Sequence, residues 1–436
     1  MNIVALTWPM FVEILLRTAL NTSDVFMLSG YSEKAVSAVG VVTQISFFLV
    51  IISMMVSTGS SVLISQYNGA DRHQDSAKIA VASIYLGLAM GIALGVLSFV
   101  ATGDIISLFG LEAQVAQFGY DYLIITASLT IMVTLGIIFS TILRAHGYSK
   151  SPMFINLFAG AINVFGNYCA LYQPFGLPVY GVQGVAIATV FSQFISAAIL
   201  WYMLRDKKID LPIGSVFAIP ALFYKKILRI GIMNAGEILS YNVSQMVIIY
   251  FVVQMGTASL TAYTYAQNIA RISFAFALAV GQASQIQTSY FIGKGWIEEI
   301  LKRVQQYFVV GLIASTTITV LAYLFRFELI DIFSDDPEVL ILTAALMGGS
   351  IILEAGRVFN LIFISSLKGA GDIAYPVKIG ILSMWGISVL LAYLFGIVFA
   401  FGVLGVWMAI AADEWIRGVI MMFRWRSKKW LRYTLT

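Results

Sequence analysis

Charged residues are scarce in this sequence. Only 11% of its 436 residues are Asp, Glu, Lys or Arg, and 60% are hydrophobic. A typical soluble domain contains about 25% charged residues. This composition excludes a soluble domain of useful size and argues against nucleic-acid binding and soluble enzyme chemistry. We therefore predict a polytopic membrane protein that is not an enzyme.

Cysteine and histidine are almost absent. The single cysteine, Cys169, excludes an intrachain disulfide and a metal site built from cysteines. The two histidines, His73 and His146, fall in predicted loops, which argues against a histidine metal centre. We expect no metal and no cofactor beyond a coupling ion.

Long apolar segments are abundant instead. About twelve of them are long enough to span a bilayer, which predicts an all-α protein with twelve transmembrane helices. The predicted spans are 3–29, 36–66, 77–103, 114–143, 153–173, 182–204, 228–254, 259–291, 300–325, 339–367, 374–400 and 403–423.

Basic residues are concentrated in every second loop. Most of the 26 Lys and Arg residues lie in the even-numbered loops, at their helix edges or in the C-terminal tail. The odd-numbered loops hold Lys34 and Arg326, together with several acids. By the positive-inside rule, both termini are predicted to be cytoplasmic, and the alternation supports an even number of spans.

The chain also repeats itself at an offset of about 224 residues. "FVEILL" (11–16) aligns with "AGEILS" (235–240), Gly69 with Gly293, and "LRAHGYSKSP" (143–152) with "LKGAGDIAYP" (367–376). Parallel repeats of six helices are typical of transporters. The sequence therefore predicts an N-lobe at 1–207, a cytoplasmic linker at 208–226 and a C-lobe at 227–436.

Several charges inside the spans have an opposite charge three or four residues away. Such neighbours share a helix face and can pair, so each set is interpreted first as an ion pair that fixes helix packing. The predicted pairings are Glu13 with Arg17, Glu354 with Arg357, and Arg417 with both Asp413 and Glu414.

Asp24 and Glu237 have no such partner on their own helix. A carboxylate at the bilayer centre costs about 2.5–3.5 kcal/mol on insertion scales and is a candidate for function. A carboxyl that gains and loses a proton as water access alternates is the simplest coupling element. With further oxygens nearby it would instead hold Na⁺. The alternative is an acid satisfied by neighbouring polar groups, with no role in turnover.

The fifth span supplies such oxygens. Asn163 and Asn167 lie four residues apart in "NLFAGAINVFGNY" (156–168) and share a helix face, and Asn156 begins the segment. Amides inside a membrane helix need partners. They either serve helix packing or surround Asp24.

Together these features resemble the multidrug and toxic compound extrusion (MATE) family of prokaryotic type. The resemblance rests on Trp8–Pro9, an acid late in the first span, "LRAHG" followed by Pro, the Asn-rich fifth span, "YGVQGVAIAT", "EAGRVFN" and "LKGAGD" followed by Pro. It covers nearly the whole chain. It implies two six-helix lobes that form a V around a central cavity.

The resemblance also implies site residues. Asp24 matches the family's acid in the first helix, Asn163 and Asn167 match a pair in the fifth, and Thr189 matches a hydroxyl in the sixth. Asn167 stands where some members have Asp. Glu237 matches an acid of the seventh helix. Some members have a further acid in the tenth helix, but Arg357 occupies that place here, with Glu354 one turn earlier.

The resulting prediction is an antiporter of the bacterial inner membrane that exports cationic, lipophilic drugs by alternating access, driven by H⁺ or Na⁺. The partners expected are small organic cations, the coupling ion and the lipid bilayer, with the protein acting as a monomer. The first alternative is a flippase for lipid-linked sugars, which would favour a strongly cationic cavity. The second is a scaffold or a channel, that is, a membrane protein that is not a transporter.

Overall fold

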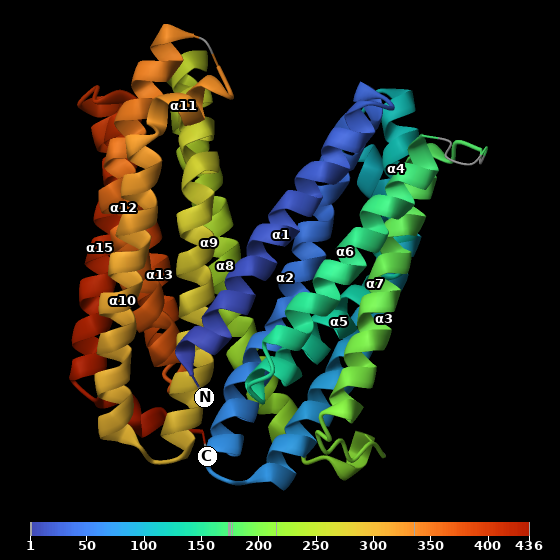
Figure 1. Ribbon diagram of the computed structural model, residues 1–436, viewed down its shortest axis with the longest axis vertical. Coiled ribbons are helices and arrows are strands. Elements are labelled where there is room, and N and C mark those ends of the chain that lie inside the picture. Colours follow the sequence, from blue (N-terminus) through green and yellow to red (C-terminus); the bar gives the residue numbers. More distant parts are fainter. Residues whose placement is uncertain (1, 173–175, 177, 215, 335, 436) are drawn as a thin grey trace. The chain divides into compact units, whose positions relative to one another are not determined.

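A computed structural model describes residues 2–172, 176, 178–214, 216–334 and 336–435, and the regular structure within these ranges is entirely helical (Figure 1). Short 3₁₀ and π-helical turns interrupt or follow some of the α-helices. The α-helices are α1 (Ile3–Ser29), α2 (Glu33–Gly69), α3 (His73–Ser107), α4 (Ala113–Ser128), α5 (Thr130–Ala145), α6 (Lys150–Leu171), α7 (Gly181–Asp206), α8 (Ala221–Gln254), α9 (Thr257–Gly293), α10 (Ile297–Leu324), α11 (Arg326–Asp331), α12 (Pro337–Gly369), α13 (Ala374–Ser383), α14 (Leu390–Tyr393) and α15 (Gly402–Arg426).

The helices follow the predicted spans closely. Within the described ranges, ten helical segments are long and apolar enough to cross a membrane, and the bent pair α4–α5 gives an eleventh. This pair is the predicted span 114–143, and its two helices meet at 47° around Leu129. The predicted span 403–423 is α15, which carries Asp413, Glu414 and Arg417 and is therefore less apolar. Residue 173, the predicted end of the span 153–173, lies outside the described ranges.

Helix α8 begins earlier than predicted. The sequence pattern places its start at residue 228, whereas the helix starts at Ala221, directly after Pro220. Proline is tolerated at the start of a helix because the first N–H groups have no partner within the helix. The last part of the predicted linker 208–226 is therefore helical.

The chain forms two compact units. The N-terminal unit comprises Val12–Ile64 and Arg72–Ala235, and α6 and α7 pack together within it. The C-terminal unit comprises Met1–Phe11, Ser65–Asp71 and Gly236–Thr436, and α9, α10, α12 and α15 pack within it. Helices α1, α2 and α8 contribute residues to both units. The units therefore do not coincide with the predicted lobes 1–207 and 227–436.

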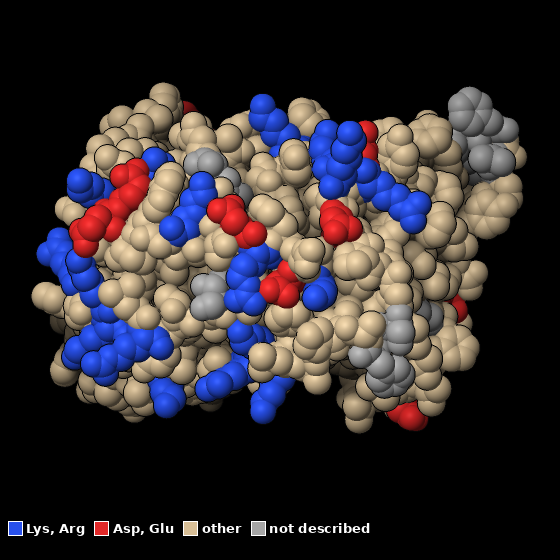
Figure 2. All heavy atoms as spheres, turned by 90° about the horizontal axis from the view of Figure 1, so that it is seen from below, with Lys and Arg blue, Asp and Glu red and all other residues tan. Residues whose placement is uncertain are grey.

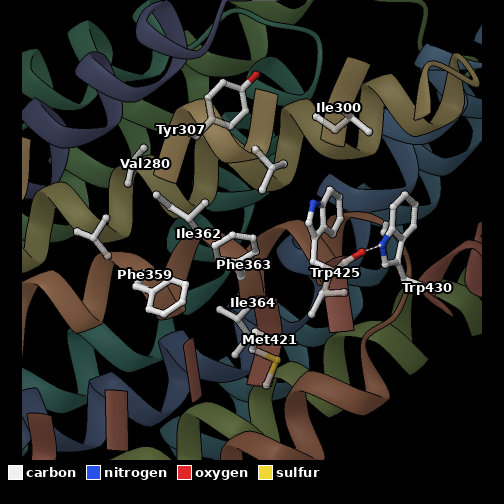
Figure 3. Close-up of a cluster of buried hydrophobic side chains, with 14 of the residues drawn as sticks. Val280, Ile300, Tyr307, Phe359, Ile362, Phe363, Ile364, Met421, Trp425 and Trp430 are labelled. Atoms are coloured by element: carbon white, nitrogen blue, oxygen red, sulfur yellow. Dashed lines mark hydrogen bonds between the residues drawn. The ribbon is translucent and has the colours of Figure 1, made fainter. Parts of the chain in front are cut away.

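An aromatic and aliphatic cluster is buried within the C-terminal unit (Figure 3). Phe363 and Ile300 are buried in it, and Trp425 stacks on Trp430 with ring centroids 4.6 Å apart. The indole Nε1 of Trp430 donates a hydrogen bond of 2.8 Å to the carbonyl of Trp425. Ile3 packs against the same cluster, so the beginning of α1 and Trp430 of the C-terminal tail lie at the same place in this unit.

Two glycines allow α2 and α9 to approach closely within the C-terminal unit. A Cβ on Gly69 would lie 2.0 Å from the carbonyl oxygen of Tyr290, and a Cβ on Gly293 would lie 2.0 Å from that of Gln66. These glycines are the pair that the internal repeat aligns. Because each obstacle is backbone, neither contact can be relieved by a side-chain rotation.

We therefore expect Gly293→Ala to destabilise the protein. Overpacking of a close contact costs about 1–3 kcal/mol, and the midpoint of thermal unfolding in detergent should fall. The matched control is Gly40→Ala in α2, because a Cβ there meets nothing within 4 Å and Ala favours a helix over Gly by about 1 kcal/mol. Equal midpoints for Gly293→Ala and the wild type would show that α2 and α9 do not touch at this point.

Candidate functional site

Asp24 lies on α1 and is half-buried against α6. Its Oδ1 accepts a hydrogen bond of 2.7 Å from Nδ2 of Asn167, whose side chain is fully buried. The predicted neighbourhood of Asp24 and Asn167 is therefore present in the structure. The partner of Asp24 is neutral, so the carboxyl is not tied up in an ion pair at this bond.

A chain of polar groups continues from Asn167 to α7. Nδ2 of Asn167 lies 3.5 Å from Oδ1 of Asn163, and Nδ2 of Asn163 donates a 3.1 Å bond to Oγ1 of Thr189. Tyr122 on α4 lies beside Thr189. Asn163, Asn167 and Thr189 thus lie together with Asp24 as predicted. Sequence reasoning missed Tyr122, because one tyrosine among 21 carries no distinguishing signal.

The arrangement leaves oxygen atoms available at Asp24. Oδ1 of Asn167 is buried and has no hydrogen-bond partner among the described atoms. A buried acceptor without a partner costs about 1–3 kcal/mol, so a bound cation or a proton donor beside it would be favourable. Carboxylate, amide and hydroxyl oxygens are the groups that suit a proton or a hard cation such as Na⁺. This chain of groups fits a coupling ion.

Glu13 does not pair with Arg17, and that prediction is wrong. Its Oε2 accepts a 2.5 Å bond from Nη2 of Arg144 at the end of α5, and its Oε1 accepts a 2.8 Å bond from Nδ2 of Asn156 on α6. Two donors from other helices therefore satisfy both carboxylate oxygens. Asn156, whose Oδ1 accepts from Ser196, therefore serves Glu13 and not Asp24.

His146 lies in the loop after α5. Burial lowers the pKa of its imidazole, although a 2.8 Å contact between Nδ1 and the carbonyl of Ile142 acts in the opposite direction. The ring is therefore neutral at neutral pH.

Glu237 finds its partner on another helix. Its Oε2 lies 2.5 Å from Nζ of Lys368 in the last turn of α12, and both side chains are buried. Arg357 contacts Glu354, as its spacing predicts, and within the described part of the chain it makes no recorded bond to Glu237. Glu237 is thus compensated, unlike Asp24.

A second network is buried between α12 and α15. Nη1 of Arg357 donates a 2.5 Å bond to Oε1 of Glu354. Nη2 of Arg417 lies 2.8 Å from Oδ2 of Asp413 and 3.0 Å from Oε1 of Glu414. These contacts confirm the predicted pairings. The network holds three carboxyl groups and two guanidinium groups.

Neutral groups from other positions complete this network. Asn360 donates a 2.8 Å bond to Oε2 of Glu414, and Ser383 donates to Oδ1 of Asp413. The sequence pattern did not single out either residue. Spacing along one helix reveals partners on that helix only, and Ser383 lies on α13.

Comparisons with known proteins agree with this picture. The family model described as MatE matches residues 9–169 and 235–394, one match in each half of the repeat. The "uncharacterized transporter YisQ" of Bacillus subtilis (strain 168) is 36% identical, over 99% of this chain and 95% of its own length. The "probable multidrug resistance protein NorM" of Thermotoga maritima is 25% identical, over 98% of this chain and 92% of its own length.

A solved structure is similar over almost the whole fold. It is described as the "outward-facing conformation of a multidrug resistance MATE family transporter of the MOP superfamily", and it matches with a TM-score of 0.88 at 19% identity. The match covers 98% of this chain and 95% of the other. At this identity the likeness establishes the fold alone.

Proposed function

This chain belongs to the MATE family of membrane transporters, and from this premise we propose that it exports cationic, lipophilic drugs from the bacterial cytoplasm in exchange for H⁺ or Na⁺. The observation that carries the proposal is the Asp24–Asn167 contact. Asp24 is a half-buried acid in a spanning helix whose recorded partner is a neutral amide, and an amide oxygen of Asn167 without a recorded partner lies beside it. A charge held in this way is available to a coupling ion.

The proposed cycle requires Asp24 to bind the ion differently in two states. H⁺ or Na⁺ reaches Asp24 from outside, the N-terminal unit rearranges, and the drug leaves. The state that is open to the cytoplasm then releases the ion and accepts a new drug. Equal affinity for the ion in both states would couple nothing, because a ligand shifts an equilibrium only through its differential affinity.

The proposed location is the inner membrane, with both termini cytoplasmic. Figure 2 views the protein from the end where Figure 1 marks the N- and C-termini, and Lys and Arg side chains are prominent on this face. An excess of basic residues marks the cytoplasmic side of a bilayer. Because these residues report orientation, they are not evidence for an anionic substrate.

The flippase alternative requires a cationic cavity for a pyrophosphate group. Arg357 and Arg417 do not favour it, because both are bonded to carboxylates. Among the four arginines in the middle of spanning helices, Arg17 and Arg271 are the two without a recorded bond to a carboxylate in the described part of the chain. A transporter of organic cations is therefore the better supported function.

The proposal predicts that purified protein in liposomes moves ethidium against an imposed ion gradient. A proton gradient and a sodium gradient are imposed separately, and dye fluorescence is followed. Transport driven by the proton gradient alone assigns H⁺ as the coupling ion, and transport that needs sodium assigns Na⁺. If neither gradient moves the dye beyond the rate of protein-free liposomes, cation-coupled drug export is wrong.

A further inference from the structure

The C-terminal tail, residues 427–435, follows directly from the last spanning helix. The predicted span 403–423 covers about 30 Å at 1.5 Å per residue, which equals the thickness of the hydrocarbon core. Helix α15 continues to Arg426, so its last turn leaves the hydrocarbon. The polar headgroup layer adds about 6 Å on each side, and the tail therefore begins in this layer.

The tail is folded back against the C-terminal unit. Its 3₁₀ turn, Lys429–Tyr433, places Trp430 against Trp425 in the buried cluster (Figure 3). Further along, the backbone N–H of Leu435 donates a 3.0 Å bond to Oε1 of Gln66 at the end of α2, which belongs to the same unit. The tail is therefore anchored on both sides of the turn, and the side chains on its outer face are held in place.

The outer face of the 3₁₀ turn is basic. Lys429 and Arg432 are both exposed, whereas Trp430 between them is buried. Side chains three residues apart eclipse in a 3₁₀ helix, and the rise is about 2.0 Å per residue, so these two charges lie on one face about 6 Å apart along the axis. Leu431 and Tyr433 are exposed beside them. Such a mixture of basic, apolar and aromatic side chains is typical of the membrane interface.

The bases on this face are not balanced by acids. Arg424, at the end of α15, is paired, because its Nε lies 2.8 Å from Oδ2 of Asp372. By contrast, Arg426, Lys429 and Arg432 form no recorded bond to an acid in the part of the chain that the structure describes. The tail itself contains no Asp or Glu. Uncompensated positive charge is therefore held at the depth of the lipid phosphate groups.

We propose that the outer face of the C-terminal tail binds an anionic phospholipid, with the lipid phosphate between Lys429 and Arg432 and with Arg426 beside it. Ammonium and guanidinium groups bind phosphate oxygens through charge-assisted hydrogen bonds, and basic segments next to a spanning helix attract anionic lipids. The depth of the tail and its exposed apolar side chains select a lipid over a soluble phosphate. Because the tail also bonds to Gln66, the bound lipid stabilises the contact between the end of α2 and this unit.

Native mass spectrometry of the protein in detergent tests this assignment, because it resolves individual bound lipids. The probes are phosphatidylglycerol and phosphatidylcholine with identical acyl chains. Lys429→Gln combined with Arg432→Gln should raise the dissociation constant of the first bound phosphatidylglycerol about 25-fold, since each base near an anionic lipid contributes about fivefold. The dissociation constant of phosphatidylcholine should not change. An unchanged affinity for phosphatidylglycerol would overturn the proposal.

Arg72→Gln combined with Lys78→Gln is the matched control. It removes the same charge from two bases that already lie beside Asp75, so it should leave the binding of phosphatidylglycerol unchanged. An equal loss in this control would show that the net charge of the protein, and not the tail, governs lipid binding. Glycerol 3-phosphate distinguishes a lipid site from a phosphate site. It should not displace phosphatidylglycerol, and full displacement would overturn the proposal in favour of a soluble phosphate.

A second measurement, with all bases of the tail intact, decides the case in which the double variant does not fold. Leu431→Cys in a Cys169→Ser background carries a bimane label, and the protein is placed in phosphatidylcholine nanodiscs that contain a small fraction of brominated lipid. Brominated phosphatidylglycerol should quench this label more than the same fraction of brominated phosphatidylcholine. A label on Leu108→Cys, an exposed position at the end of α3, should be quenched equally by both lipids. Equal quenching at Leu431→Cys would refute the proposal.

Discussion

Asp24→Asn is expected to reduce gradient-driven dye export to the rate of protein-free liposomes. The amide has nearly the same shape as the carboxyl, and its oxygen can still accept the 2.7 Å hydrogen bond that Asn167 donates. An amide neither binds a proton at neutral pH nor carries a charge for Na⁺. The variant should therefore fold and bind dye, while the imposed gradient no longer drives transport. The measurement is the ethidium assay with the proton and sodium gradients imposed separately.

Asp104→Asn is the matched control, because Asp104 is an exposed acid near the end of α3 and its loss should leave transport unchanged. Thr189→Val adds a second comparison. It removes a hydroxyl from the polar chain, so a sodium-driven exporter should need more Na⁺, whereas a proton-driven exporter should change little. Full export by Asp24→Asn would make Asp24 a structural acid and would redirect the search to the buried network around Glu354.

Part of the neighbourhood of Asp24 could be predicted from the residues themselves. An acid without a local partner and two amides four residues apart stand out in apolar spans, whereas Thr189 was predicted only through the family resemblance. Burial removes water as a partner for such groups, so they must satisfy one another. What spacing along the chain does not give is the bond between Asn167 and Asp24, since these residues lie 143 positions apart.

The partner of Glu13 shows where the same reasoning fails. Spacing offered Arg17 on the same helix, and the structure selects Arg144 from α5. The internal repeat contained the missing information. At an offset of 224 residues Glu13 aligns with Glu237 and Arg144 aligns with Lys368, and each acid in the structure bonds the base 131 residues further along the chain.

Each unit therefore has its own copy of this ion pair, whereas the Asp24–Asn167 contact occurs in the N-terminal unit. By the same offset, Asp24 aligns with Ile248 and Asn167 with Leu391, so the C-terminal unit has no equivalent of the Asp24–Asn167 contact. A pair retained in both halves serves the common architecture, in which the first helix of each repeat is fastened to the end of its fourth span. The Asp24–Asn167 contact, which is present in the N-terminal half alone, is a candidate for a role that is specific to that half.

The retained pairs should differ in strength, and Lys368→Met is expected to destabilise the protein more than Arg144→Met. The side chains of Glu237 and Lys368 are 9% and 11% exposed, against 19% for both Glu13 and Arg144. Asn156 also remains as a donor to Glu13, whereas the repeat places Gly380 at the equivalent position beside Glu237. Removal of one partner from a buried ion pair costs about 3–5 kcal/mol, because the other charge is left uncompensated.

The measurement is the midpoint of thermal unfolding in one detergent, with each single variant compared with its double. Glu237→Gln in the Lys368→Met background removes the stranded charge and should restore most of the lost stability. The same reasoning applies to Glu13→Gln with Arg144→Met, with a smaller loss to recover. If the double variants melt as low as Lys368→Met and Arg144→Met alone, the bases stabilise the units by packing and not by charge. A larger loss for Arg144→Met than for Lys368→Met would show that burial and the second donor do not set the strength of these pairs.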